Sequence, residues 1–113
     1  SQREMDRAAR SVKSQIGFYA STRNYRVILE CHGWGQVARD LTRRSIEGDW
    51  EAMTSLITDE MLEAFAIVGA PAEIPAKLRH RYTGLLDRLS VYEPFHPEGN
   101  PTAQRALLAA FPR

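Results

Sequence analysis

Three histidines are the side chains of this sequence best suited to metal binding or proton transfer. His32, His80 and His96 are far apart, and none is followed three or four residues later by another histidine or a carboxylate. That spacing is what a helical metal-ligand pair requires, so the sequence predicts no metal site. His80 lies in a basic helical stretch typical of a solvated face, and His32, which precedes a Gly-Trp-Gly turn, is typical of a turn or capping position.

The basic run 77–81 is the second candidate, because lysine and arginine neutralise phosphate charge. It alternates with Leu78 and Tyr82 on a predicted helix whose other face is apolar, which favours a solvated helix face. The formal net charge of +1 gives no global attraction to nucleic acid or to an anionic membrane. We therefore predict neither partner.

The predicted helix start at Gly69-Ala70-Pro71 is the third candidate, since backbone N–H groups there could hold an anion. Pro71 removes one donor, and Glu73 already places a negative charge at this end. The sequence therefore predicts a self-capped helix start and not a phosphate site.

The residues 88–92 read as a short strand in which Leu89 faces one side and Ser90 and Tyr92 face the other. Tyr92 could donate a hydrogen bond to a cofactor, and tyrosine is equally a common filler of strand surfaces. A lone strand leaves its backbone groups unpaired, and the only other candidate strand is 66–68. We expect the missing neighbours to come from another segment or another chain.

Helices must position these groups, because apolar spacing and capping residues predict helices along most of the chain. The predicted helices are 3–20, one beginning near 25, 36–47, 50–57, 60–65, 75–82 and 101–111. The buried stripe of the first is Met5, Ala8, Ala9, Val12, Ile16 and Tyr19, and the narrow seam of the third is Val37, Leu41 and Ile46. The fold class is thus mainly α with one or two short strands, in two segments, 1–66 and 67–113.

Composition points to a cytoplasmic protein. Cys31 is the single cysteine, which excludes an intramolecular disulfide and suits a reducing compartment, and we expect it to be a small buried hydrophobe. No stretch approaches the length of a membrane span, and the first residues are polar helix formers rather than a signal peptide.

The sequence resembles the bacterial luciferase-like oxidoreductases in two stretches. Val68-Gly69-x-Pro71-x-Glu73-Ile74, followed by Leu78-Arg79, Gly84 and Asp87-Arg88-Leu89-Ser90, looks like the last helix-strand unit of that family. The upstream stretch 15–22, with Tyr25-Arg26 and Leu29-x-x-His32-Gly33-Trp34, is similar to the deazaflavin-dependent branch. The chain departs from the family at Ile74-Pro75, where a second acidic residue is usual.

The resemblance implies the C-terminal third of a (β/α)8 TIM barrel, a fold that needs about 250 residues. Segment 1–66 would be a late barrel helix with insertion helices, and 67–113 the final unit with the eighth strand and eighth helix. Barrel sites lie at the C-terminal ends of strands, so Tyr92, Glu93 and His96 would lie nearest the cofactor. No catalytic residue is assigned.

The parent enzyme would transfer hydride between a deazaflavin, coenzyme F420, and a small organic substrate, with FMN as the alternative cofactor. We expect the isolated chain to bind no cofactor and to be inactive. Its expected partners are the missing barrel segments or a second copy of itself in a homo-oligomer. The alternative is a small helical interaction or dimerisation module without catalysis.

Overall fold

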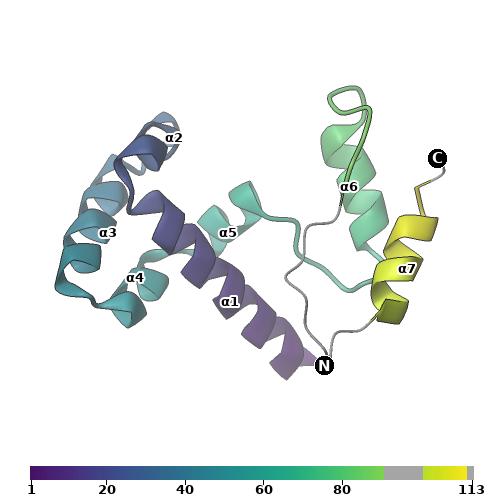
Figure 1. Ribbon diagram of the computed structural model, residues 1–113, viewed down its shortest axis with the longest axis horizontal. Coiled ribbons are helices and arrows are strands. Elements are labelled where there is room, and N and C mark those ends of the chain that lie inside the picture. The colour runs from purple at the N-terminus through teal and green to yellow at the C-terminus, as the bar shows by residue number, and fades with distance from the viewer. Residues whose placement is uncertain (91–100, 112–113) are drawn as a thin grey trace. The chain divides into compact units, whose positions relative to one another are not determined.

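The computed structural model describes residues 1–90 and 101–111 (Figure 1). The chain divides into two compact units, Ser1–Ala66 and Ile67–Arg113, and each is described by itself. The remaining residues, 91–100 and 112–113, include the end of the predicted strand and lie outside the described part.

The first unit is a bundle in which the long helix α1 packs against α3, α4 and α5, and α2 packs against α3 (Figure 1). Its elements are α1 (Gln2–Ala20), the 3₁₀ helix η1 (Arg23–Tyr25), α2 (Arg26–Cys31), α3 (Gly35–Glu47), α4 (Trp50–Leu56) and α5 (Asp59–Phe65). The core consists of Ala20, Leu29, Ala38, Leu41, Met53, Ile57 and Met61, contributed by all five α-helices and the end of α4.

Helix α1 begins with a capping box, in which the backbone N–H of Glu4 donates to Ser1 Oγ at 3.3 Å and the Glu4 side chain bonds back to Ser1. Hydrogen bonds from the N-terminal ammonium and the Ser1 side chain hold the pKa of Glu4 below its usual value. Gly17 is buried on the α4 side, where a Cβ would lie 3.3 Å from the Met53 carbonyl oxygen. The absence of a side chain at Gly17 therefore sets how closely α1 and α4 approach.

Local capping signals confirm several predicted helix boundaries. Asp49 Oδ1 accepts from the Ala52 backbone N–H at 3.1 Å, and Thr58 Oγ1 accepts from Met61 N–H at 3.2 Å. Gly48 ends α3 with φ 72°, a left-handed conformation that glycine adopts without steric cost.

The burial predictions for Cys31 and Ile46 are wrong. Cys31 is exposed at the last residue of α2 rather than buried. Ile46 is 82% exposed, because it lies five residues beyond Leu41 and so turns away from the buried face of α3. Ala38, one turn before Leu41, is fully buried and takes the place in the seam that we predicted for Ile46.

The second unit contains α6 (Ile74–Tyr82) and α7 (Pro101–Ala109). Ahead of α6, Glu73 Oε2 accepts from the Ala70 N–H at 2.9 Å, and Lys77 Nζ donates to the Val68 carbonyl oxygen at 2.6 Å. The Glu73 carboxylate thus satisfies a backbone donor of the turn ahead of the helix, whereas no side chain caps the N–H groups of α6 itself. Arg79 donates to the Ala110 carbonyl oxygen, and its guanidinium lies over the Phe111 ring at 5.0 Å from the centroid.

The described residues contain no strand, so neither of the predicted short strands is seen among them. Neither 88–90 nor 66–68 pairs as a strand within the described ranges, and a strand forms only where a neighbouring strand accepts its ladder of hydrogen bonds. Residues 91 and 92 of the predicted strand lie outside the described part. Among the described helices none is long and apolar enough to cross a membrane.

Candidate functional site

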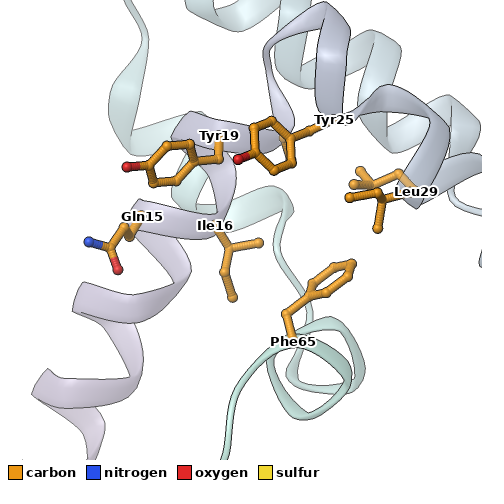
Figure 2. Close-up of a pocket in the computed structure, with 8 residues that line it drawn as sticks. Gln15, Ile16, Tyr19, Tyr25, Leu29 and Phe65 are labelled. Carbon is orange, nitrogen blue, oxygen red and sulfur yellow. The ribbon is translucent and has the colours of Figure 1, made fainter. Parts of the chain in front are cut away.

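An open apolar hollow of about 240 Å³ lies between α1, η1, α2 and α5 of the first unit (Figure 2). It is lined by Gln15, Ile16, Tyr19, Ala20, Tyr25, Ile28, Leu29 and Phe65. Ala20 and Leu29 belong to the buried core, so the hollow opens directly above it.

The turn after α1 brings the two tyrosines of the rim together. Ser21 and Thr22 stop the helix by donating their hydroxyls to the Phe18 and Tyr19 carbonyl oxygens, each at 2.7 Å. The 3₁₀ helix η1 follows at once and places the Tyr25 ring 5.6 Å from the Tyr19 ring, centroid to centroid. Figure 2 shows both rings at the mouth of the hollow, with Phe65 across from them.

Two aromatic rings, those of His32 and Trp34, contact the Phe65 ring. The Phe65 ring meets Trp34 edge to face at 5.8 Å and His32 edge to face at 5.5 Å. His32 in turn stacks on Trp34 at 4.7 Å with an interplanar angle of 10°. Trp34 and Phe65 both pack against the buried core, so the Phe65 ring has contacts on more than one side.

The lining of the hollow is suited to binding an apolar group by its shape and not to catalysis. None of its lining residues carries a charge, and its polar groups are the Gln15 amide and the Tyr19 and Tyr25 hydroxyls. Such a surface takes up an apolar side chain or ring, and the rim can donate one or two hydrogen bonds to it. The lining offers no carboxylate, imidazole or amine for proton transfer.

The residues predicted from barrel position, Tyr92, Glu93 and His96, lie outside the described residues, so their roles stay predictions. His32 takes part in the aromatic cluster at the turn after α2, and His80 is exposed on α6. Within ranges 1–90 and 101–111, no group of three or more histidine, cysteine or acidic side chains could hold a metal ion.

The hollow was not singled out from the sequence. Tyr19 was expected in the buried stripe of the first helix, whereas it is half exposed at the rim. One sequence feature does indicate the hollow. Ile16 and Tyr19, and likewise Tyr25 and Ile28, are three residues apart, so the members of each pair are neighbours on a helix surface, and both pairs lie in the stretch that carries the family resemblance.

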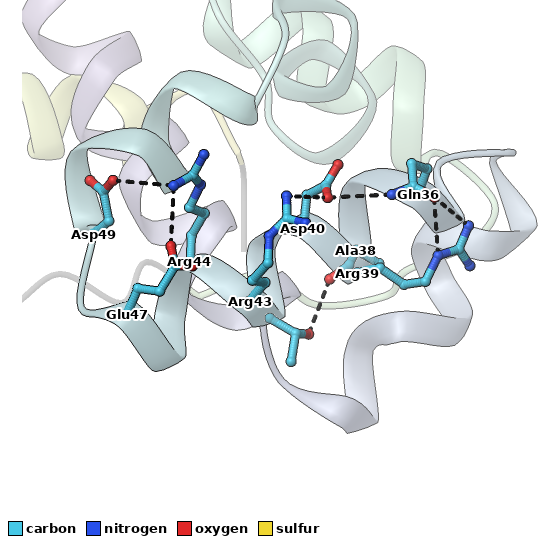
Figure 3. A network of polar contacts seen from close by, with 9 residues as sticks. Gln36, Ala38, Arg39, Asp40, Arg43, Arg44, Glu47 and Asp49 are labelled. Atoms are coloured by element: carbon cyan, nitrogen blue, oxygen red, sulfur yellow. Dashed lines mark hydrogen bonds and ion pairs between the residues drawn. The ribbon is translucent and has the colours of Figure 1, made fainter.

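Helix α3 contributes nothing to the hollow and carries a polar network along its outer face instead (Figure 3). Gln36 bonds to both Arg39 and Asp40, and Arg43 pairs with Asp40 at 2.9 Å. Arg44 pairs with Glu47 at 3.1 Å and with Asp49 at 3.8 Å. Exposed pairs of this kind stabilise a solvated helix face and give no site.

The chain belongs to the luciferase-like monooxygenase family, because the sequence model of that family matches residues 2–88.

Its relatives are mycobacterial proteins. The uncharacterized protein Rv1360 of Mycobacterium tuberculosis is 49% identical over 86 residues, which make up 76% of this chain and 25% of that protein. The uncharacterized protein Mb1395 of Mycobacterium bovis matches with the same identity and coverage. The chain thus spans about a quarter of the length of these curated relatives. No solved structure matches the chain significantly.

Proposed function

We propose that this chain is the C-terminal part of a luciferase-like oxidoreductase of the TIM-barrel fold that uses the deazaflavin coenzyme F420. The reaction is hydride transfer between the deazaflavin and a small organic substrate, with FMN as the alternative cofactor. The observation that carries the proposal is the family match over residues 2–88 of this chain. The mycobacterial relatives, which are about four times as long as their aligned stretch, support the reading of this chain as one part of a larger enzyme.

Two features of the sequence support the finer assignment. The stretch 15–34 is similar to the deazaflavin-dependent branch, and 68–90 is similar to the last helix-strand unit of the family. The hydrogen bond from the Ala70 N–H to the Glu73 carboxylate ahead of α6 supports a structural role for the Gly-Ala-Pro turn. On this proposal, residues 88–92 pair as a strand once the neighbouring barrel strands are present.

The described residues do not by themselves fit a deazaflavin or FMN. The hollow of about 240 Å³ is smaller than a usual cofactor site, which occupies about 300–1,000 Å³. No lining residue carries a positive charge for a cofactor phosphate, and the donors are limited to one amide and two phenols. The rest of the polypeptide must therefore supply the cofactor site, and we assign no chemical step to the described residues.

The proposed contribution of this chain is to close the barrel and to bring Tyr92, Glu93 and His96 to its mouth. Tyr92 could donate a hydrogen bond there, and His96 could exchange a proton. These roles follow from the resemblance and from barrel geometry alone.

A second candidate function is a helical interaction module without catalysis. The observation that favours it is the row of exposed apolar side chains beside the hollow, among them Val27 at 57% and Tyr25 at 44% exposure. A cytoplasmic location suits either candidate.

A chimeric protein tests the proposal. The 113-residue chain replaces the aligned stretch of the M. tuberculosis relative, and coenzyme F420 and FMN are titrated into the chimera, the intact relative and the isolated chain. We expect the relative and the chimera to bind F420 with similar affinity and the isolated chain to bind neither cofactor. Tyr92→Phe and His96→Ala in the chimera then test the two side chains through hydride-transfer rates.

The possible outcomes distinguish an error in the identity of the cofactor from an error in the proposed function as a whole. A folded chimera that binds FMN but not F420 would replace the deazaflavin assignment by a flavin. A folded chimera that binds neither cofactor, beside a relative that binds one, would refute the proposal. Micromolar binding by the isolated chain would show that the cofactor site lies within the 113 residues.

A further inference from the structure

We propose that the hollow and the exposed aromatic row beside it form the surface on which the rest of the luciferase-like polypeptide docks. The occupant is an apolar side chain, aromatic or long and aliphatic, from the three quarters of the relatives' length that this chain does not span. This inference rests on the proposed function for the identity of the docking segment.

The aromatic row is a continuous line of ring contacts on the surface of the first unit, formed by Trp50, Phe18, Tyr19 and Tyr25. The Phe18 ring lies 6.3 Å from Trp50 and 5.7 Å from Tyr19, and Tyr19 lies 5.6 Å from Tyr25. All four side chains are between 44% and 55% exposed. Contiguous exposed apolar surface of this kind marks an interaction site, whereas single exposed apolar residues do not.

The row continues into the mouth of the hollow, because Tyr19 and Tyr25 belong to both. Ile28 lines the hollow and is 40% exposed, and its neighbour Val27 is 57% exposed. A line of aromatic residues beside a concave apolar pocket has the composition of an interface core, in which tyrosine and tryptophan are enriched and charges are depleted.

The polar network of α3 contrasts with this surface. Its arginines and acidic groups pair with one another along the helix (Figure 3), and none of the α3 residues lines the hollow. The first unit therefore has charged, mutually paired side chains along α3, whereas the side chains that line the hollow are all uncharged. The charged face of α3 is stable in contact with water, whereas the apolar lining of the hollow is more stable when another part of a protein covers it.

The size of the hollow limits the occupant to one side chain. An engineered protein cavity of about 150 Å³ holds benzene, so about 240 Å³ accommodates a substituted ring or a leucine-sized side chain with room for rearrangement. The absence of charge on the lining excludes a lysine or a carboxylate as a favourable occupant. The Tyr19 and Tyr25 hydroxyls can bond to the backbone of the docking segment at the rim.

The comparison with the relatives favours a segment of the same polypeptide over a second copy. Both mycobacterial relatives carry the aligned 86 residues within a chain four times that length. In such a chain a covering segment is present at a high effective concentration, so an apolar surface is covered without a second molecule.

Calorimetry with a truncated relative tests the docking surface. The truncated relative is the M. tuberculosis protein without its aligned stretch, and the full 113-residue chain is titrated into it. The variants Ile28→Glu, at the hollow, and Ile46→Glu, on the exposed face of α3, make the same chemical change at two exposed positions. We expect Ile28→Glu to weaken binding by about 10- to 100-fold and Ile46→Glu by less than about 2-fold.

The chimera gives a second readout if the truncated relative does not fold. There Ile28→Glu lowers the melting temperature and Ile46→Glu leaves it unchanged, while far-UV circular dichroism of the isolated chain checks that both variants remain helical. Equal effects of the two variants in both experiments would overturn the docking surface. Self-association of the chain that Ile28→Glu abolishes would make a second copy the occupant and would also overturn the proposal.

The failure of the proposed function would look different. A chimera that binds neither cofactor, while Ile28→Glu still weakens docking, would refute the oxidoreductase and leave the docking surface intact. If the chimera binds a cofactor but Ile28→Glu and Ile46→Glu weaken docking equally, the docking surface would be refuted and the oxidoreductase would stand.

Discussion

Substituting Gly17 by valine tests how closely α1 packs against α4 in the first unit. A Cβ at this position would lie 3.3 Å from the Met53 carbonyl oxygen and 3.6 Å from Ile57 Cγ1. The nearer atom belongs to the backbone of α4, so it cannot move aside as a side-chain end could. The two further methyl groups of valine would require α1 and α4 to separate.

The expected cost follows from two opposing terms. Overpacking a closely packed site costs about 1–3 kcal/mol, and replacing a helical glycine by valine returns about 0.3 kcal/mol through helix propensity. The net destabilisation is about 1–2.5 kcal/mol, which corresponds to a fall of roughly 5–15 °C in melting temperature for a unit of this size.

Thermal unfolding followed by far-UV circular dichroism measures this change in the 113-residue chain. Ser14→Val, at an exposed position of the same helix, is the matched control and should change stability by less than about 0.5 kcal/mol. If Gly17→Val melts at the wild-type temperature, α1 and α4 do not approach each other closely at Gly17, which contradicts the packing described above.

Three further predictions concern helix ends. Gly48→Ala should cost about 1 kcal/mol in urea unfolding, because φ is 72° there and no atom lies within 4 Å to stabilise a side chain; an unchanged midpoint would contradict the left-handed cap. Asp49→Ala should cost about 1 kcal/mol through loss of the bond to the Ala52 N–H, and Asp49→Asn should restore most of it. By NMR titration the pKa of Glu4 should be below its usual value and should rise on N-terminal acetylation. Because folding depresses this pKa, its stabilising effect is present at neutral pH and is lost as the pH falls through the folded-state value.

The helices could be predicted from the sequence because their ends are fixed by local chemistry. Asp49, Thr58 and Gly48 act within one turn of their own positions, so residue type and spacing were sufficient. The burial of Cys31 and Ile46 could not be predicted in the same way. Each depends on which face of a helix meets its neighbours, and a seam with one small residue such as Ala38 gives a weak apolar signal.

The strand and the hollow depend on residues far apart in the chain. A strand at 88–92 requires neighbouring backbone that the described residues do not contain, so the alternating pattern alone was insufficient. The hollow requires α1, α2 and α5 to converge on Phe65, and no local pattern encodes that convergence. The family resemblance, by contrast, could be recognised from the sequence because its motifs are short and ordered.

The crystal structure of the chimera with the M. tuberculosis relative tests the central claim most directly. The account predicts that residues 88–92 pair as a strand of a closed barrel and that an apolar side chain from outside the grafted chain fills the hollow beside Tyr25. A structure in which the 113 residues fold as a separate helical unit, with 88–92 unpaired and the hollow open to solvent, would contradict it.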